Sequence, residues 1–370
     1  MCLQPDTRPG IVFTVDKCPA CYFNSKTDAK IWNSRVETLK KIFADYRNKN
    51  SNYDCIIGVS GGKDSIRQAV LVRDFYGLRP LLVVVSYPPG QVTQRGISNL
   101  NNLSELGFDI YSSHPSPKTW RALMRKSFLE YGNWAKSTEL ALFAGVPQIA
   151  LELGINLIIW GENPAIQLGD LGTLADEGWN GNLSKQMNTI KDIDGSSFAN
   201  QEIMGNKLFP YNYPSQNKFI DSKLQIVYLG WAMQTWSLLE NGLFSMSLGL
   251  SPRAIGPKFT SDLLSLSSLD EDWVIVNQMI KFYKFGFGKT TEYVNELIRK
   301  KMISRNEGIA LVEEFDGSCA KEYIVSFCDF LEIEISTFWR VIYEYTNKSL
   351  FDIKPKSRPL KKFKVGIGVM

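Results

Sequence analysis

Residues 60–65, Ser-Gly-Gly-Lys-Asp-Ser, combine hydroxyls, glycines, an amine and a carboxylate in one short loop between an apolar run and a helix-forming stretch. Backbone N–H groups at the start of a helix have no partner within the helix, so they bind anions. Gly61 and Gly62 let a ligand approach the backbone closely, and Lys63 adds a positive charge. Because the carboxylate of Asp64 would repel a bare phosphate, it predicts a Mg²⁺ ion between this carboxylate and the phosphate.

This loop matches neither of two common phosphate-binding fingerprints. A Walker A loop needs Gly-x-x-x-x-Gly-Lys-Ser/Thr, and a dinucleotide site needs Gly-x-Gly-x-x-Gly. The string 60–65 instead resembles the PP-loop of the ATP pyrophosphatase superfamily, whose members cleave ATP between the α and β phosphates and release pyrophosphate. The alternative interpretation, a glycine-rich turn with a serine helix cap, explains only part of the string.

The composition is that of a soluble globular protein with two or three domains. Of 370 residues, 44% are hydrophobic and 22% are charged. The net charge of +4, from 42 basic and 38 acidic residues, is too small to predict a nucleic-acid partner, and the basic stretch 354–364 is interpreted as a solvated tail. No apolar run approaches the ~20 residues that span a bilayer. The N-terminus shows no signal pattern, so we expect a cytoplasmic protein with reduced or metal-bound cysteines.

Strands and helices alternate through the first half of the chain, which predicts an α/β fold with a doubly wound, mostly parallel sheet. The predicted strands are 55–59, 79–87, 108–112 and 156–160, and the predicted helices are 31–49, 66–76, 91–106, 118–131 and 137–153, the last kinked or divided at Pro147. Loops at the carboxyl ends of such strands converge on one crevice. We therefore expect the loop 60–65 to meet Ser86-Tyr87-Pro88-Pro89-Gly90 and Gly161-Glu162-Asn163-Pro164 there.

The second half of the chain has a different character. Residues 164–220 are rich in Gly, Asn and Asp without clear periodicity, and are interpreted as a substrate-site insertion or a disordered surface loop. Further helices are predicted at 222–245, 270–285, 290–301, 304–314, 319–331 and 335–346. The predicted domains are a cysteine-rich segment plus helix (1–50), a nucleotide-binding domain with an insertion near 164–220 (51–245) and a helical C-terminal domain (246–370).

Segments beyond the loop carry a more specific resemblance. They are Cys2-Leu3-Gln4-Pro5-Asp6-Thr7-Arg8-Pro9-Gly10-Ile11, Cys18-Pro19-Ala20-Cys21, parts of 99–109, Gly161-Glu162-Asn163-Pro164, Phe285-Gly286-Phe287-Gly288-Lys289-Thr290-Thr291-Glu292 and Ile303-Ser304-Arg305-Asn306-Glu307-Gly308. With these segments, nearly the whole chain resembles the bacterial N-acetyl-sugar amidotransferases, the WbpG-type enzymes of surface-polysaccharide and glycan synthesis. The loop alone indicates only the superfamily, whereas the N-terminal cysteines and the Gly-Phe-Gly-Lys block make this family the specific match.

The resemblance implies an ATP-dependent amidotransferase of lipopolysaccharide O-antigen or glycan biosynthesis. ATP would activate the acetamido oxygen of a nucleotide-linked diacetamido uronic acid, and ammonia would displace AMP to leave an acetamidino group. The family's ammonia comes from a separate HisH-like glutaminase docked with a HisF-like barrel protein. This chain is consistent with a separate glutaminase. A glutaminase centre pairs a cysteine nucleophile with a histidine base, and His114 is the one histidine in the sequence. His114 itself is interpreted as structural or peripheral.

Four residues are predicted to be catalytic: Lys63, Asp64, Glu162 and Lys289. Glu162 would orient ammonia or take its proton, or would instead cap a loop at a strand end. Lys289 would hold the pyrophosphate, or would be a surface lysine before a helix. The residues predicted to bind ATP are Ser60, Gly61, Gly62, Lys63, Asp64, Ser65, Ser86 and Gly161, with Asp64 also the Mg²⁺ ligand.

Three cysteines near the N-terminus predict a metal site. Cys18 and Cys21 have the spacing of a metal knuckle, and Cys2 precedes them. Many relatives begin with Cys-x-x-Cys, and Cys2 aligns with the second of that pair, so the resemblance implies zinc with one ligand missing here. Either Cys319 or another group supplies the fourth ligand, or the site is weak or empty. The two remaining cysteines are interpreted as buried hydrophobic side chains.

A PP-loop tRNA thiolation enzyme is the alternative function, because such enzymes also pair this loop with cysteine knuckles. It would need a sulfur-carrying cysteine or an iron–sulfur cluster near the loop, and a basic face for RNA. The near-neutral charge and the family segments favour the amidotransferase. The intact loop disfavours a third possibility, a scaffold that only binds ATP.

Overall fold

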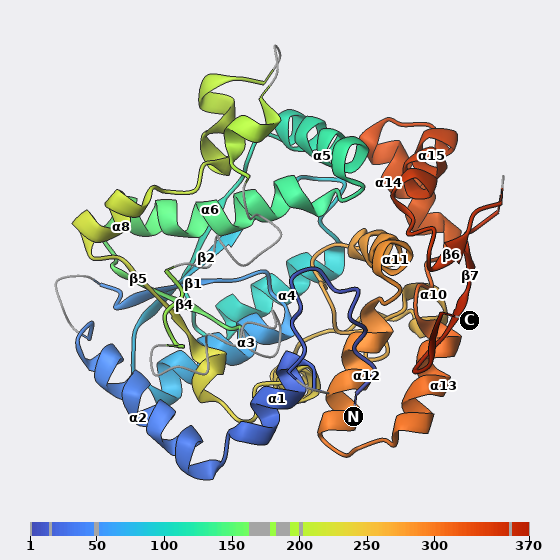
Figure 1. Ribbon diagram of the computed structural model, residues 1–370. Helices are drawn as coiled ribbons and strands as arrows, with labels where there is room; N and C mark the ends of the chain where they lie inside the picture. The colour runs from blue at the N-terminus through green and yellow to red at the C-terminus, as the bar shows by residue number, and fades with distance from the viewer. Residues whose placement is uncertain are drawn as a thin grey trace.

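The computed structural model describes residues 2–14, 17–47, 52–162, 178–182, 193–199, 203–354 and 357–369. Its centre is a five-stranded sheet in the order β3-β2-β1-β4-β5, with every neighbouring pair parallel (Figure 1). The strands are β1 (Cys55–Gly58), β2 (Pro80–Val85), β3 (Ile110–Ser113), β4 (Leu157–Trp160) and β5 (Gln225–Tyr228). The predicted α/β class with a parallel, doubly wound sheet is confirmed.

Helices cover both faces of this sheet, which is why the central strands are continuous apolar runs. One face packs against α2 (Ala29–Ala44), α3 (Lys63–Val70), the π-helical turn η1 (Leu71–Phe75) and α4 (Gln94–Glu105). The other face packs against α6 (Ala135–Leu153) and α8 (Gln216–Ser222) (Figure 1). Neighbouring side chains of β1 alternate between the two layers, since Ile57 belongs to the first core cluster and Ile56 to the second.

The fifth strand corrects the prediction of a helix over 222–245. The sequence Gln225-Ile226-Val227-Tyr228 forms β5 beside β4, and the chain then passes through a 3₁₀ turn, η6 (Leu229–Ala232), to α9 (Leu238–Ser247). A strand this short cannot be told from a helix by periodicity alone. The tryptophans that follow, Trp231 and Trp236, extended the apolar pattern and favoured the wrong interpretation.

The region 164–220 is also more ordered than predicted where it is described. It contains two 3₁₀ helices, η4 (Gly195–Phe198) and η5 (Gly205–Tyr211), followed by α8. Phe198 and Tyr211 are fully buried in the large core cluster beneath α5 (Pro117–Tyr131), so this part is no disordered surface loop. Such short 3₁₀ pieces carry no long periodicity that a sequence would show. Residues 163–177, 183–192 and 200–202 lie outside the described residues.

The prediction that the helix 137–153 is kinked or divided at Pro147 is corrected in part. This proline lies inside α6, which continues without division from Ala135 to Leu153. Both Pro147 and its neighbour Val146 are buried against the sheet, so packing holds the helix together across the missing N–H. None of the helices in the described ranges is both long enough and apolar enough to span a membrane.

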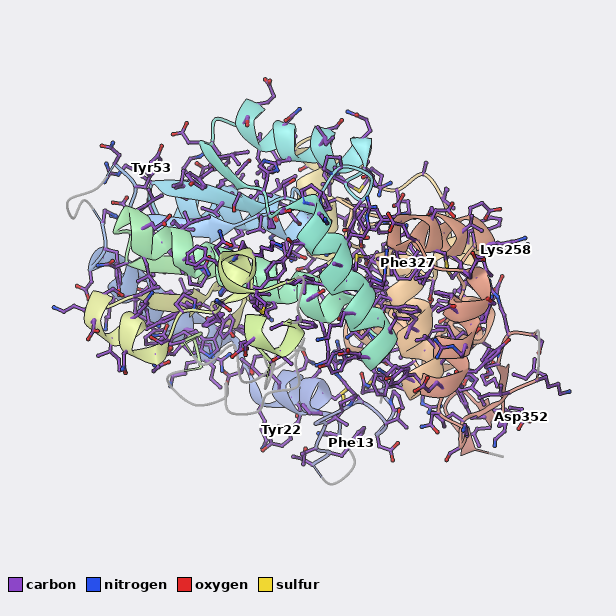
Figure 2. The ribbon with its side chains drawn as sticks, turned by 90° about the horizontal axis from the view of Figure 1, so that it is seen from above. Phe13, Tyr22, Tyr53, Lys258, Phe327 and Asp352 are labelled. Carbon is purple, nitrogen blue, oxygen red and sulfur yellow. The ribbon has the colours of Figure 1, made fainter. Side chains whose placement is uncertain are left out.

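The C-terminal region is helical, as predicted, and packs against α5 and α6. Its helices are α10 (Pro257–Thr260), α11 (Val274–Phe285), α12 (Lys289–Arg299), α13 (Arg305–Phe315), α14 (Lys321–Leu331) and α15 (Ile335–Tyr345), followed by short hairpins β6 (Phe351–Asp352) with β7 (Leu360–Lys361) and β8 (Phe363–Lys364) with β9 (Gly368–Val369). Figure 2 shows Phe327 inside this helical group. Its ring meets Phe128 of α5 edge to face at 5.2 Å, which joins the region to the sheet domain.

The N-terminal segment lies across α12 before the chain enters α1 (Pro19–Lys26) (Figure 1). The backbone N–H of Leu3 donates to Oδ1 of Asn295 at 2.6 Å, and the hydroxyl of Thr7 donates to the carbonyl of Phe285. Leu3 is buried with Val294 and Val312 in a small cluster of its own. These contacts bring the first residues of the chain beside helices that follow about 280 residues later.

Candidate active site

The glycine loop joins β1 to α3 at the carboxyl edge of the sheet. Since the strand order reverses between β1 and β4, this is the position where open α/β sheets bind ligands. Gly61 has a φ of +78°, and a Cβ there would lie 2.8 Å from the backbone nitrogen of Leu100, so only glycine fits. No side chain caps the first turn of α3, so its first N–H groups are able to bind an anion.

Within the loop, Lys63 and Asp64 form an ion pair. Nζ of Lys63 lies 2.7 Å from Oδ2 of Asp64, and the lysine side chain is almost fully buried. A second donor, Nδ2 of Asn241 on α9, lies 2.6 Å from Oδ1 of Asp64. Burial raises the pKa of Asp64, but the lysine charge and the two hydrogen bonds outweigh it and leave the pKa below its usual value. Asp64 is therefore ionised and suited to a cation.

A cavity of about 270 Å³ opens beside the loop, between β1 and β4. Five predicted site residues line it: Ser60, Asp64, Ser65, Gly161 and Glu162. Apolar side chains of α6 form the opposite wall: Leu142, Phe143 and Val146. The structure thus brings the predicted loop and the end of β4 together, while Asn163 and Pro164 lie outside the described residues.

Glu162 is the unusual carboxyl group of this cavity. Its Oε2 is buried and has no hydrogen-bond partner among the described residues. Its pKa is raised to about 7, mainly by burial; a backbone hydrogen bond opposes this rise, and the charge of Asp64 adds to it. A carboxyl group with a pKa near neutrality can both accept and return a proton at physiological pH.

Ser86 lies in a neighbouring hollow of about 280 Å³ rather than beside Glu162. Ser60 contributes to this hollow as well, so it adjoins the loop, and its other walls include Tyr87, Ile97 and Leu100. His114 and Asp270 also line it, and sequence analysis assigned neither of them to the site. A mostly apolar hollow with few polar groups suits a flat heterocycle.

On the other side of Asp64, a third cavity reaches α12 and the N-terminal segment. Lys289, which was predicted to hold the pyrophosphate, lines this cavity together with Asp64. Its Nζ lies 3.0 Å from Oε2 of Glu292, whose Oε1 lies 2.5 Å from Nζ of Lys281. Burial lowers the pKa of Lys289, yet Glu292 reverses this and raises it. Two ammonium groups around one carboxylate leave surplus positive charge near Asp64.

Two residues of this cavity that were not predicted contact predicted site residues directly, Glu292 and Asn241. Glu292 belongs to the Gly-Phe-Gly-Lys block, so its proximity to Lys289 could have marked it. Asn241 has no sequence signal, because it follows β5, which was itself missed.

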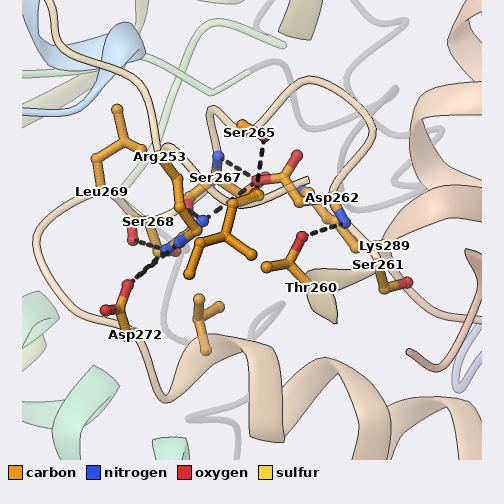
Figure 3. A network of polar contacts seen from close by, with 12 residues as sticks. Arg253, Thr260, Ser261, Asp262, Ser265, Ser267, Ser268, Leu269, Asp272 and Lys289 are labelled. Atoms are coloured by element: carbon orange, nitrogen blue, oxygen red, sulfur yellow. Dashed lines mark hydrogen bonds and ion pairs between the residues drawn. The ribbon is translucent and has the colours of Figure 1, made fainter. Parts of the chain in front are cut away.

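Arg253 fixes the connection that leads from α9 to α11 (Figure 3). Arg253 is 4% exposed, and its guanidinium donates to carboxylate oxygens of Asp262 and Asp272 at 3.4 and 3.1 Å. It also donates to the carbonyls of Ser267, Ser268 and Glu271. Asp262 in turn raises the pKa of Lys289 through its charge, so this network helps to hold the lysine protonated.

The three N-terminal cysteines converge as predicted. Their Sγ atoms lie within 4.8 Å of one another, and Cys2 lies 3.4 Å from both Cys18 and Cys21. Three thiolates around zinc at ~2.3 Å would stand about 3.8 Å apart, so the donor set and spacing fit such an ion. Cys18 also lines the cavity that contains Asp64 and Lys289, which places this cluster next to the site.

Of the alternatives left open for a fourth ligand, Cys319 is excluded, because the cluster of the described residues does not include it. It is buried in the C-terminal helical core, where its Sγ contacts the carbonyl of Ala320 at 3.6 Å. Within the described ranges, the metal-binding cluster contains only the three N-terminal cysteines. The sequence could not show this, because only the tertiary fold decides whether residues as far apart as 2 and 319 meet. The other two cysteines, Cys55 and Cys328, are buried in apolar cores as predicted.

Comparisons with known proteins support part of this picture. Residues 258–364 match the family described as the C-terminal domain of WbpG-like LPS biosynthesis proteins. No curated protein matches the chain. Among solved structures, the U34-tRNA thiolase NcsA from Methanococcus maripaludis, with its 4Fe-4S cluster, is 13% identical with a TM-score of 0.28, covering 81% of this chain and 88% of that chain. At this level of similarity the likeness implies nothing about activity.

Proposed function

We propose that this chain, a WbpG-type protein with an ATP-binding PP-loop, is an amidotransferase that converts an acetamido group of a nucleotide-linked diacetamido sugar into an acetamidino group. The observation that carries the proposal is one shared cavity. Asp64 of the loop and Lys289 of the WbpG-like region line it together, although they are 225 residues apart in the chain (289 − 64). This shared cavity supports a single site built from the family region and the loop 60–65.

The three cavities around the loop suit the three parts of the reaction. The apolar hollow at Ser86 would take the adenine, and the N–H groups of the loop would hold the phosphates. Lys289, with its surplus positive charge, would stabilise the departing pyrophosphate. The sugar amide would then approach from the side of Glu162, next to the α-phosphate.

The reaction requires the protein mainly to position the reactants and to accept a proton. The acetamido oxygen attacks the α-phosphorus, the bond to the β-phosphate breaks, and pyrophosphate leaves. Neutral ammonia then adds to the amide carbon, AMP leaves with the oxygen, and one proton must be removed to give the amidinium ion. Glu162, with an unpartnered oxygen and a pKa near 7, would accept that proton.

Two metal ions and two partner proteins belong to the proposal. Mg²⁺ bound by Asp64 would neutralise phosphate charge during the transfer. Cys2, Cys18 and Cys21 would hold zinc and so fix the N-terminal wall of the cavity. Ammonia would come from a HisH-like glutaminase acting with a HisF-like barrel protein, and the pathway would be lipopolysaccharide O-antigen or glycan biosynthesis in the cytoplasm.

The test is to incubate the purified chain with ATP, Mg²⁺, ammonium and a nucleotide-linked diacetamido uronic acid. Mass spectrometry should show the product with one oxygen replaced by NH, together with AMP and pyrophosphate. A reaction without Mg²⁺ and one without ammonium are the controls. Formation of ADP and orthophosphate, or transfer of sulfur to tRNA with no change in any acetamido sugar, would refute the proposal and favour the thiolation alternative in the second case.

A further inference from the structure

We propose that Asn241 positions Asp64, because its buried amide links the carboxylate to Arg67 and leaves the carboxylate one usable orientation. The proposal rests on the proposed use of ATP by the loop and names a positioning residue for it. Asn241 is 1% exposed on α9. Its Nδ2 lies 2.6 Å from Oδ1 of Asp64, and its own Oδ1 lies 2.6 Å from Nη1 of Arg67.

The chemistry of Arg67 decides which way the amide of Asn241 faces. A guanidinium carries only donors, so the amide oxygen must face Arg67 and the amide N–H group must face Asp64. Arg67 cannot turn away, because it also donates to the carbonyl and the hydroxyl of Thr235, each at 2.7 Å. The direction of the hydrogen bonds from Arg67 to Asp64 is therefore fixed.

Asp64 is constrained from both sides as a result. Its Oδ1 accepts from Asn241 and its Oδ2 accepts from Lys63 at 2.7 Å. A proton on either oxygen would displace one of these donors, so the arrangement favours the ionised carboxylate. The remaining lone pairs are available in the cavities that Asp64 lines, where a cation and phosphate would sit.

The same helix also holds the backbone of the loop. Oγ of Ser245, fully buried one turn after Asn241, donates to the carbonyl of Lys63 at 2.6 Å. Thus α9 contacts the main chain of one loop residue and the side chain of the next. The strand β5 therefore matters for the site, since β5 and η6 lead directly into α9 and position it beside the loop.

The first test is Asn241→Leu, a change of similar volume that removes the donor. Calorimetry of ATP binding to the full chain at increasing Mg²⁺ should show a half-saturating Mg²⁺ concentration about tenfold to hundredfold higher than in the native chain, as expected for one hydrogen bond to a charged group. The matched control is Asn102→Leu. Asn102 donates to the carbonyl of Leu248 just beyond α9, at 2.9 Å, so its loss loosens the helix without touching Asp64. Its Mg²⁺ dependence should stay native.

The second test, Asn241→Asp, separates positioning from simple folding. The new carboxyl keeps an acceptor for Arg67; when protonated it can donate to Asp64 as the amide does, and when ionised it repels Asp64. The other charged groups around Asp64 are Lys63, Arg67, Glu162 and Lys289, and Glu240 acts on Arg67; all of them remain in the variant. Affinity for ATP with Mg²⁺, relative to the native chain, should therefore fall as the pH rises from about 5.5 to about 8.

The outcomes are distinct. Equal Mg²⁺ dependence in the native chain and Asn241→Leu overturns the inference. A relative affinity of Asn241→Asp that rises with pH also overturns it, because the new group would then be acting as a cation ligand. If the native chain binds no ATP at any Mg²⁺ concentration, the proposed function fails and this inference fails with it. Should Asn241→Leu not fold, the sign of the pH effect in Asn241→Asp still decides.

Discussion

Replacing Glu162 by Gln should stabilise the protein at alkaline pH while it removes amidine formation. The carboxyl of Glu162 lies in the cavity between β1 and β4, with one buried oxygen that has no partner in the described part of the chain. A carboxylate in that position is poorly solvated, so the folded protein resists its ionisation. Glutamine has nearly the same shape and carries no charge at any pH.

The magnitude follows from the pKa of this group. Burial raises the pKa of Glu162 from its ordinary value of 4.5 to about 7. Since one pKa unit corresponds to about 1.4 kcal/mol, ionising Glu162 costs the folded state up to about 3 kcal/mol. Water entering the cavity screens part of this charge, so we expect a gain of about 1 to 3 kcal/mol in Glu162→Gln.

The sign of the pH dependence is fixed by proton binding. Between about pH 4.5 and about pH 7, the folded state holds Glu162 protonated while the unfolded chain has lost that proton. The free energy of unfolding of the native protein therefore falls as the pH rises through this window and stays lower above it. In Glu162→Gln this position cannot ionise, so its free energy of unfolding does not fall in this way. The two proteins should therefore have similar stability near pH 4 and differ most near pH 8.

Urea denaturation of both proteins at several pH values measures the difference directly. The control is Glu152→Gln, an exposed position on the same helix as the opposite wall, where no pH-dependent difference is expected. Ammonium-dependent AMP release should be lost only in Glu162→Gln. A stability difference that does not change with pH, or a native protein that is the more stable one at pH 8, would refute the reasoning.

Three further perturbations test other parts of the site. Asp64→Ala should abolish ATP-dependent pyrophosphate release while the circular dichroism spectrum stays native, and near-native turnover would exclude the loop from the reaction. Cys2→Ser should lower the zinc content of purified protein, measured by mass spectrometry, from about one ion per chain, whereas equal metal content in both proteins would argue against a three-cysteine site. Arg253→Ala should reduce the free energy of unfolding in urea by about 3 to 5 kcal/mol, because it leaves Asp262 buried without its cation. The matched control, Arg340→Ala, breaks an exposed pair and should cost at most about 0.5 kcal/mol, and a similar loss in both variants would contradict the buried network.

The part of the fold that the sequence predicts well is the part governed by local patterns. The apolar runs around Ile57 and Val83 predict parallel strands covered on both faces. The loop between β1 and α3 follows a parallel strand, so its position at the carboxyl edge of the sheet can be predicted as well. The helices α11 to α15 follow amphipathic periods and end at signals such as Gly286, which adopts a φ of +75° after α11. Each of these features is set by neighbours within a few residues.

The missed features depend on contacts between distant residues. The strand β5 is short, and only its pairing with β4 distinguishes it from a helix. Asn241 gains its importance from Asp64 and Arg67, which lie more than 170 residues earlier. Cys319 was offered as a metal ligand on residue type alone, and the fold buries it in a different core.

The cavity beside Asp64 is assembled from four stretches of the chain, within 4–20, at 64, within 236–241 and within 289–299. During synthesis on a ribosome, the phosphate loop emerges long before the lysine that would face its ligand. A growing chain, or one clipped by a protease before α12, therefore has the loop without the opposite wall of the cavity. Under the proposed function, such incomplete chains would not consume ATP, and nucleotide turnover would begin only when the N-terminal segment and α12 have closed the cavity around Asp64.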